Sequence, residues 1–202
     1  MKLYFSPGSC SLAVHIVLHE SGLPFEAVQT STKTHLLPDG SDYYAISPNG
    51  YVPLLELDDG ERLTEGPAIN QYLADLVPEL KLAPANGTMA RYRLQEMLNF
   101  IGTELHKNIG NLFNPALPEE ARPLFRARGL ARLTWINSQL EGKTYLIGET
   151  FTIADAYLFV VANWTQHVSI DRSALTALTA FVERIGARPA VQAALKAEGL
   201  LK

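Results

Sequence analysis

The residue best suited to do chemistry is Cys10, the only cysteine in the chain. It follows the turn dipeptide Pro7-Gly8, which ends a strand predicted at residues 2–5. Because apolar residues recur at helical spacing from Ser11 onward, we expect Cys10 at the start of a helix. Backbone N–H groups and the positive end of the helix dipole favour an anion there. Cys10 is therefore a reactive thiolate, a neighbour of a ligand's thiolate, or a small buried side chain at the first helical turn.

A second set of polar residues lies along the long helix predicted from Thr88 to about Leu112. One stripe of this helix is apolar, and a stripe about 120° away carries Gln95, Asn99, Thr103 and His106. A polar stripe is usually the solvated side of a helix. Amide, hydroxyl and imidazole groups can also line a wet cleft, so these residues are candidates for a binding site.

The histidines do not form a recognisable metal site. His15 and His19 lie one helical turn apart, but no glutamate between them completes an H-E-x-x-H arrangement. We therefore expect this pair on the exposed side of the first helix, and we predict neither a metal nor an organic cofactor.

The elements that position Cys10 form a predicted βαβ–ββα unit. The first helix ends at Gly22, and a strand at residues 25–30 should run parallel to the first strand. A hairpin then turns at Asp58-Asp59-Gly60, and a helix begins near Glu65-Gly66. Proline is unusual inside a strand, so a cis Val52-Pro53 bond would begin the hairpin and leave the backbone before it free to pair.

The remainder of the chain shows only helical patterns. Residues 79–87 are predicted as a linker, which separates an α/β domain at 1–78 from an all-α domain at 88–202. After the long helix, further helices are expected near residues 118–140, 153–167, 174–186 and 189–198. Thr152-Ile153-Ala154-Asp155 is a capping box, which we interpret as structural.

The composition is ordinary for a globular protein of 202 residues, with 19% charged residues and a net charge of −4. No basic run favours nucleic-acid or membrane-surface partners. A single cysteine suits a reducing compartment, and we find neither a signal peptide nor an apolar run long enough for a membrane span. We therefore expect a cytoplasmic protein.

The chain resembles the glutathione S-transferases. The shared features are the βαβ–ββα unit with Val52-Pro53 and Glu65-Gly66, and the helical domain with its capping box. The N-terminal domain of that family is thioredoxin-like. More narrowly, several segments are similar to the bacterial beta class: Ser6–Leu12, Leu63–Gly66, Gln71–Asp75, Asn99–Ile101 and Glu104–Lys107. The resemblance covers essentially the whole chain.

The resemblance implies a glutathione site. Val52, before the implied cis Pro53, would pair with the cysteinyl part of glutathione, an extended-peptide mode of recognition. Glu65 and the amides from Gly66 onward would bind the γ-glutamyl end, and Cys10 would lie beside the glutathione sulfur. Further contacts would come from Asn99 of the same subunit and from Thr103, Glu104 and His106 of the same or the partner subunit.

Two positions depart from the beta class. Gly66 lacks the hydroxyl of the serine often found there, and His35 stands where a lysine commonly binds the glycine carboxylate of glutathione. Lys33 is the other candidate for that carboxylate. Both departures predict weaker glutathione binding and the same reaction.

The implied activity is conjugation of glutathione to small hydrophobic electrophiles, a detoxification reaction, including reductive dehalogenation. Helix amides and His106 would stabilise the thiolate, while Lys107, Phe113 and Trp164 would contact the electrophile. Two alternatives remain: a glutaredoxin-like monothiol reductase or peroxidase that uses Cys10, and a non-catalytic protein that binds glutathione or hydrophobic ligands. The family also implies a homodimer.

Overall fold

The computed structural model describes residues 1–201, which form two compact units. The N-terminal unit comprises residues 1–80 together with residues 188–202, of which 202 lies outside the described residues, and the helical unit comprises residues 81–187. The predicted domains were 1–78 and 88–202. The structure differs at the C-terminus, because the last helix groups with the N-terminal unit.

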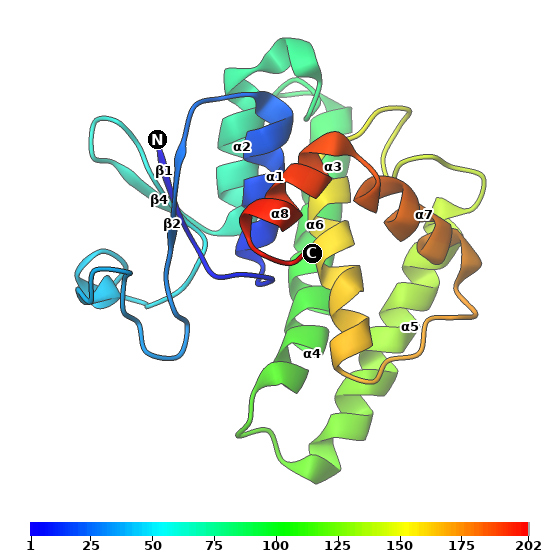
Figure 1. The fold of residues 1–202 in the computed structure, drawn as a ribbon. Helices are drawn as coiled ribbons and strands as arrows, with labels where there is room; N and C mark the ends of the chain where they lie inside the picture. Colours follow the sequence, from blue (N-terminus) through cyan, green and yellow to red (C-terminus); the bar gives the residue numbers. More distant parts are fainter. Residues whose placement is uncertain (202) are drawn as a thin grey trace. The chain divides into compact units, whose positions relative to one another are not determined.

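The N-terminal unit is built on a mixed four-stranded sheet with the strand order β2-β1-β3-β4. Strands β1, β2 and β4 are labelled in Figure 1. The strands are β1 (Lys2–Phe5), β2 (Glu26–Gln29), β3 (Leu54–Glu56) and β4 (Arg62–Thr64). β1 is parallel to β2 and antiparallel to β3, so that Leu3 lies opposite both Ala27 and Leu55. β3 and β4 are antiparallel, with Leu55 opposite Leu63. With α1 (Ser11–Ser21) and α2 (Gly66–Leu76), this arrangement confirms the predicted βαβ–ββα fold.

Local sequence signals account for several boundaries in this unit. Gly22 ends α1 in a left-handed conformation (φ 67°), as a C-terminal glycine should. The Asp42 side chain accepts a hydrogen bond from the Tyr44 amide and caps the short 3₁₀ helix η1 (Tyr43–Ala45). A second 3₁₀ turn, η2 (Pro78–Leu80), follows α2. The Val52-Pro53 peptide bond is cis, as expected.

Helix α1 is buried on nearly all sides, which corrects one expectation. His15 and His19 were placed on the exposed side of the first helix, but His15 is only 1% exposed, and His19 is partly buried with its Nε2 atom inaccessible. The reason is that α1 contacts α2, β1 and also α8 (Pro189–Ala197). An ion pair reinforces the contact with the C-terminal segment, since Arg188 Nε lies 2.6 Å from Glu20 Oε1. A helix covered by both a neighbouring helix and a C-terminal helix leaves no solvated face for His15.

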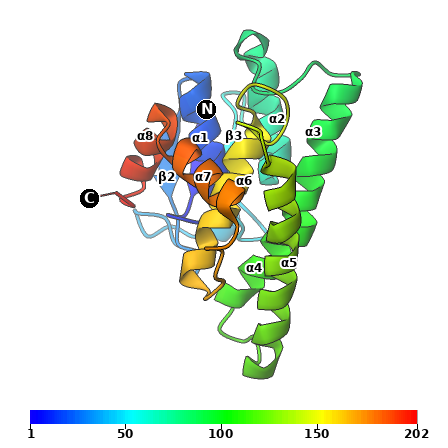
Figure 2. The same cartoon turned by 90° about the vertical axis from the view of Figure 1, so that its right-hand side faces the viewer.

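The helical unit contains α3 (Met89–Phe100), α5 (Arg122–Leu140), α6 (Ile153–Asn163) and α7 (Thr176–Gly186). Short 3₁₀ turns precede α5 (η5, Glu119–Ala121) and follow α6 (η6, Trp164–His167). Within this unit α3 contacts α6, and α5 contacts α7 (Figure 2). None of the helices formed by residues 1–201 combines the length and apolar character that crossing a bilayer requires.

The long helix predicted from Thr88 to about Leu112 is present, but it is not uniform. Thr88 caps it by accepting from the Arg91 amide at 3.2 Å. After α3 the chain winds into a π-helical segment, η3 (Ile101–His106), then α4 (Lys107–Gly110) and the 3₁₀ turn η4 (Asn111–Phe113). The π segment was not predicted, and it holds three of the candidate site residues.

The predicted capping box is confirmed at the start of α6. Asp155 is fully buried, and one of its carboxylate oxygens accepts from the Thr152 amide at 2.7 Å. The other oxygen accepts from the Leu146 amide at 2.8 Å, which ties the preceding loop to the helix. This motif defines the start of α6.

Candidate functional site

Cys10 occupies the N-cap of α1, as the sequence predicts, and its side chain is partly exposed. Its Sγ donates a hydrogen bond to the Val52 carbonyl oxygen at 3.3 Å. Val52 itself is packed in a small core with Tyr4, Tyr43 and Leu54. The fold thus joins the reactive side chain to the backbone just before the cis proline, 42 residues further along the chain.

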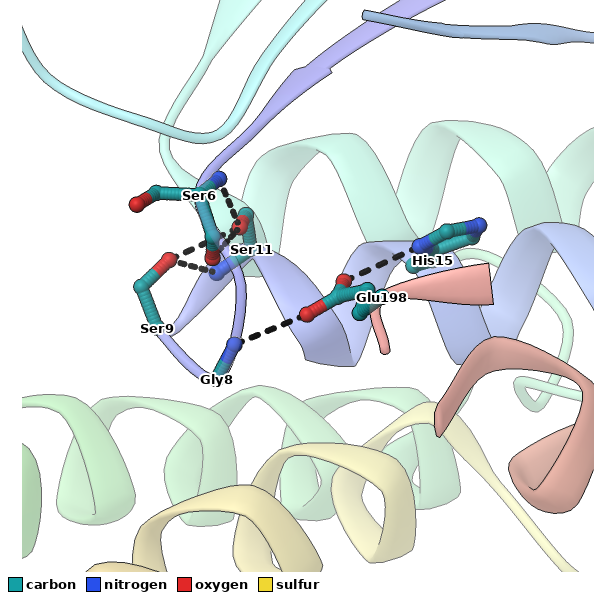
Figure 3. A network of polar contacts seen from close by, with 6 residues as sticks. All are labelled: Ser6, Gly8, Ser9, Ser11, His15 and Glu198. Atoms are coloured by element: carbon teal, nitrogen blue, oxygen red, sulfur yellow. Dashed lines mark hydrogen bonds and ion pairs between the residues drawn. The ribbon is translucent and has the colours of Figure 1, made fainter. Parts of the chain in front are cut away.

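The loop before Cys10 is held together by serine side chains (Figure 3). Ser11 is fully buried, and its Oγ accepts from the Ser6 amide at 3.1 Å. The Ser9 and Ser11 hydroxyls lie 2.8 Å apart, and the Ser9 amide donates to the Ser6 carbonyl. These contacts fix the turn that carries Cys10 onto α1.

Glu198 joins this loop to α1 from the C-terminal segment (Figure 3). Its side chain is fully buried, with Oε2 accepting from the Gly8 amide at 2.8 Å. Its other oxygen, Oε1, lies 2.9 Å from His15 Nδ1, which donates to it. This network was not predicted from the sequence. One signal could have indicated it: a histidine within an otherwise apolar helical run needs a polar partner when the helix is buried.

Glu65 lies immediately before α2 in an unusual backbone conformation. Its φ of 66° is rare for a residue other than glycine, and such conformations cluster at functional sites. The side chain is exposed, and its carboxylate makes no hydrogen bond or ion pair with another part of residues 1–201. Gly66, which begins α2, is next to Pro53, because a Cβ built on it would lie 3.6 Å from that ring.

His35 is held in place by its neighbours. It also has a positive φ, of 53°, and its ring packs on Tyr44 with centroids 4.5 Å apart. Gly50 makes room for it, since a Cβ there would lie 2.9 Å from His35 Nδ1. That nitrogen is buried without a protein partner within the described chain, whereas Lys33 is exposed.

His106 lies at the end of the π segment of the helical unit, in contact with aromatic residues. Its Nδ1 is 2.7 Å from the Tyr157 hydroxyl. Its ring meets Trp164 edge-on with centroids 4.8 Å apart, and Trp164 in turn contacts Phe113 at 5.9 Å. Burial, assisted by the Lys107 ammonium, lowers the pKa of His106 to about 4. At neutral pH the ring is therefore uncharged, and it can assist an anion only as a hydrogen-bond donor.

The remaining predicted residues of the helical unit lie on the same stretch of chain. Asn99 and Thr103 are exposed, and the Thr103 hydroxyl donates to the Asn99 carbonyl at 3.0 Å. Glu104 pairs with Arg132 of α5 at 2.8 Å. Lys107 is exposed, as is Phe113, whereas Trp164 is mostly buried.

Comparison with known proteins identifies the class. A model of the glutathione S-transferase N-terminal domain matches residues 7–76, and a model of the C-terminal domain matches residues 125–189. The chain therefore belongs to the glutathione S-transferase family. This confirms the predicted family, and with it the thioredoxin-like and all-helical architecture.

Individual relatives agree with this assignment. The chain is 48% identical to glutathione S-transferase GstA of Escherichia coli O157:H7, over 99% of this chain and 100% of that protein. It is 46% identical to the solved bacterial beta class glutathione S-transferase of Sphingomonas chungbukensis (TM-score 0.96, 100% of both chains). It is also 46% identical to a sphingomonad glutathione S-transferase solved as a complex with glutathione (TM-score 0.95, 100% of both chains). The chain is thus a glutathione transferase enzyme that is similar to the bacterial beta class.

Proposed function

We propose that this enzyme binds glutathione in its N-terminal unit and transfers the glutathione thiolate to small hydrophobic electrophiles. The observation that carries the proposal is the contact between Cys10 Sγ and the Val52 carbonyl, at the N-terminus of α1 and beside the cis proline. The helix N-terminus favours an anion, and the backbone beside the cis proline would pair with an extended peptide, which supports a position for the glutathione sulfur beside Cys10.

Each charged end of glutathione has a candidate partner in this unit. The free Glu65 carboxylate would accept from the γ-glutamyl ammonium, and the α2 amides that start at Gly66 would hold the γ-glutamyl carboxylate. His35, or Lys33 on the same loop, would serve the glycine carboxylate. The relative solved with glutathione supports this ligand.

Conjugation requires glutathione as its thiolate, because the thiol is a poor nucleophile. The α1 N-terminus would stabilise the sulfur anion, and neutral His106 would donate a hydrogen bond. The thiolate then forms a carbon–sulfur bond with the electrophile, which releases its leaving group as an anion, while the thiol proton passes to solvent. Asn99, Thr103 and Glu104 would contribute further contacts to glutathione.

The acceptor is expected among the aromatic groups around His106. Phe113 and Trp164 would contact an apolar electrophile, with Lys107 near its leaving group or anionic substituent. No organic cofactor or metal is needed. We further propose a cytoplasmic homodimer with a role in detoxification, and sedimentation of the purified protein tests the dimer.

A second candidate function uses Cys10 itself. Its side chain is partly exposed at a helix N-terminus, where a thiolate is favoured. Cys10 thiolate would attack the glutathione sulfur of a mixed disulfide, forming a Cys10–glutathione disulfide and releasing the substrate thiol. A second glutathione thiolate would then attack that disulfide, restoring Cys10 and releasing oxidised glutathione.

Two assays on the wild type and on Cys10→Ala separate these functions. One follows conjugation to a chlorodinitrobenzene-type electrophile, and the other follows reduction of a mixed disulfide by glutathione. We expect conjugation in both proteins and loss of disulfide reduction in the variant. If the wild type binds glutathione and performs neither reaction, the conjugation proposal fails and a binding role gains support.

A further inference from the structure

The hydroxyl group of Tyr157 is the partner of His106 within the helical unit. It lies 2.7 Å from Nδ1. Tyr157 is 5% exposed on α6, a helix whose start is fixed by the Thr152–Asp155 capping box. The hydroxyl is therefore carried by a buried side chain on a capped helix.

The direction of this hydrogen bond follows from the charge on the ring and from the acid–base properties of the two groups. Since the pKa of His106 is lowered to about 4, the ring is neutral and one nitrogen is free to accept. A phenol is a better acid than neutral imidazole, and imidazole nitrogen is a better base than a phenol oxygen. The Tyr157 hydroxyl therefore donates to Nδ1.

Packing keeps the His106 ring in this orientation. Trp164 lies against it edge-on, and Gly110 leaves just enough room, because a Cβ at that position would lie 3.2 Å from His106 Cδ2. The opposite nitrogen, Nε2, makes no hydrogen bond to any other residue among 1–201 and is not one of the buried unpartnered atoms. Its N–H is thus available to a ligand.

We propose that Tyr157 is a positioning residue that holds His106 as the Nε2–H tautomer, so that His106 acts as a neutral hydrogen-bond donor to an anion of the transfer reaction. This inference rests on the proposed function, which makes His106 part of the glutathione chemistry. It also limits that role, because an imidazole with a proton on Nε2 and a hydrogen bond to Nδ1 has no free lone pair. His106 therefore does not take the proton from the glutathione thiol.

The first test needs no variant. Nitrogen NMR of histidine-labelled protein at pH 7 should show His106 with a proton on Nε2 and an unprotonated, hydrogen-bonded Nδ1. In Tyr157→Phe, which removes only the hydroxyl, the His106 signals should shift toward a mixture of both tautomers. A wild-type His106 that is protonated on Nδ1, or signals that do not change in the variant, would overturn the proposal.

The second test is kinetic. Tyr157→Phe should lower kcat for conjugation by about threefold to tenfold, the scale of one hydrogen bond, with the KM for glutathione nearly unchanged. Tyr92→Phe is a matched control, because Tyr92 is exposed on α3, and it should behave as wild type. In a His106→Phe background, Tyr157→Phe should have no additional effect, whereas a further equal loss would show that Tyr157 acts independently of His106 and refute the proposal.

The two readouts separate failure of this inference from failure of the proposed function. Absence of conjugation in the wild type counts against the proposed function, while the NMR measurement still decides which tautomer Tyr157 selects. If the wild type conjugates glutathione and the NMR spectrum shows the His106 proton on Nδ1, the proposed function stands and the role of Tyr157 is overturned.

Discussion

The chemistry available to each candidate residue is determined by its immediate neighbours. Cys10 lies at the N-terminus of α1, and its thiol donates a hydrogen bond to the Val52 carbonyl oxygen. Glu65 has the opposite character, since it is exposed, charged and without a protein partner among residues 1–201. The backbone of Glu65 has a positive φ, and its carboxylate is unpaired, so this side chain is suited to bind a cationic group of a ligand.

Replacing Glu65 with glutamine tests this reading. Glu65→Gln keeps the shape of the side chain but would lose the proposed charge-assisted hydrogen bond to the γ-glutamyl ammonium. Because such bonds contribute about 1.5–3 kcal/mol, glutathione affinity should fall about tenfold to a hundredfold in calorimetric titration. Glu61→Gln, on the exposed hairpin next to β4, is the control and should bind as wild type. Equal affinities for Glu65→Gln and wild type would exclude Glu65 from the site.

The loop with His35 and Lys33 is the proposed binding site for the glycine carboxylate of glutathione. Lys33→Ala should lower the affinity for glutathione severalfold if the exposed ammonium reaches that carboxylate. His35→Lys should raise the affinity by a similar factor. Titration at low and high salt measures both, because an ionic contact is screened by salt. If neither variant changes the affinity, the carboxylate binds elsewhere.

At the level of elements, α8 and the residues after it complete the N-terminal unit. Glu198 bridges the Gly8 amide and His15, so one buried carboxylate connects the Cys10 loop to α1. Leu200 packs beside Gly8 as well, 3.7 Å from a Cβ built there. The C-terminal segment thus supports the loop that carries the thiol.

We expect Glu198→Ala to be strongly destabilising. It leaves a buried amide and a buried imidazole unpaired, which should cost about 3 kcal/mol in the free energy of unfolding. Urea denaturation measures this cost, with Lys196→Ala on the exposed side of α8 as the control. A loss of under about 0.5 kcal/mol would mean that water replaces the carboxylate without penalty.

Local signals predicted much of the fold, and the misses share a physical cause. Gly22 and the Thr152–Asp155 box act within a few residues, so their effects could be derived from the sequence. Burial of His15 depends on a partner 183 residues away, which no local pattern encodes. The same limit explains why α8 was assigned to the helical domain.

In the candidate site, too, local signals were predicted from the sequence and features that depend on tertiary packing were not. Cys10 and the Val52-Pro53 bond lie where the turn and strand signals placed them. The π segment at Ile101–His106 was missed, because an extra residue in one turn leaves no distinct periodicity in so short a stretch. The Tyr157 contact to His106 was missed as well, since it joins α6 to that segment through tertiary packing.

For the whole molecule, the protonation of His106 makes the free energy of unfolding depend on pH. Its pKa of about 4 in the folded chain lies below the value of about 6.5 expected when unfolded, so the unfolded chain binds the proton more tightly. The contribution of neutral His106 is complete above about pH 6.5 and is lost as pH falls toward 4.

The expected loss is about 3 kcal/mol between those limits. Urea unfolding of wild type and His106→Phe at several pH values measures it. Because other groups titrate in both proteins, the prediction concerns the difference: wild type should lose more stability than the variant on acidification. If the free energy of unfolding falls equally with pH in both proteins, His106 is not buried as a neutral ring.

We propose that this enzyme binds glutathione and holds it as the thiolate. The most direct measurement is the ultraviolet difference spectrum of glutathione added to Cys10→Ala protein, in which the only cysteine of the chain is absent. We predict a thiolate absorption that appears on binding at neutral pH, and that weakens in a Cys10→Ala, Tyr157→Phe double variant. If glutathione binds but shows no thiolate absorption at any pH below the pKa of its free thiol, the enzyme does not stabilise the thiolate.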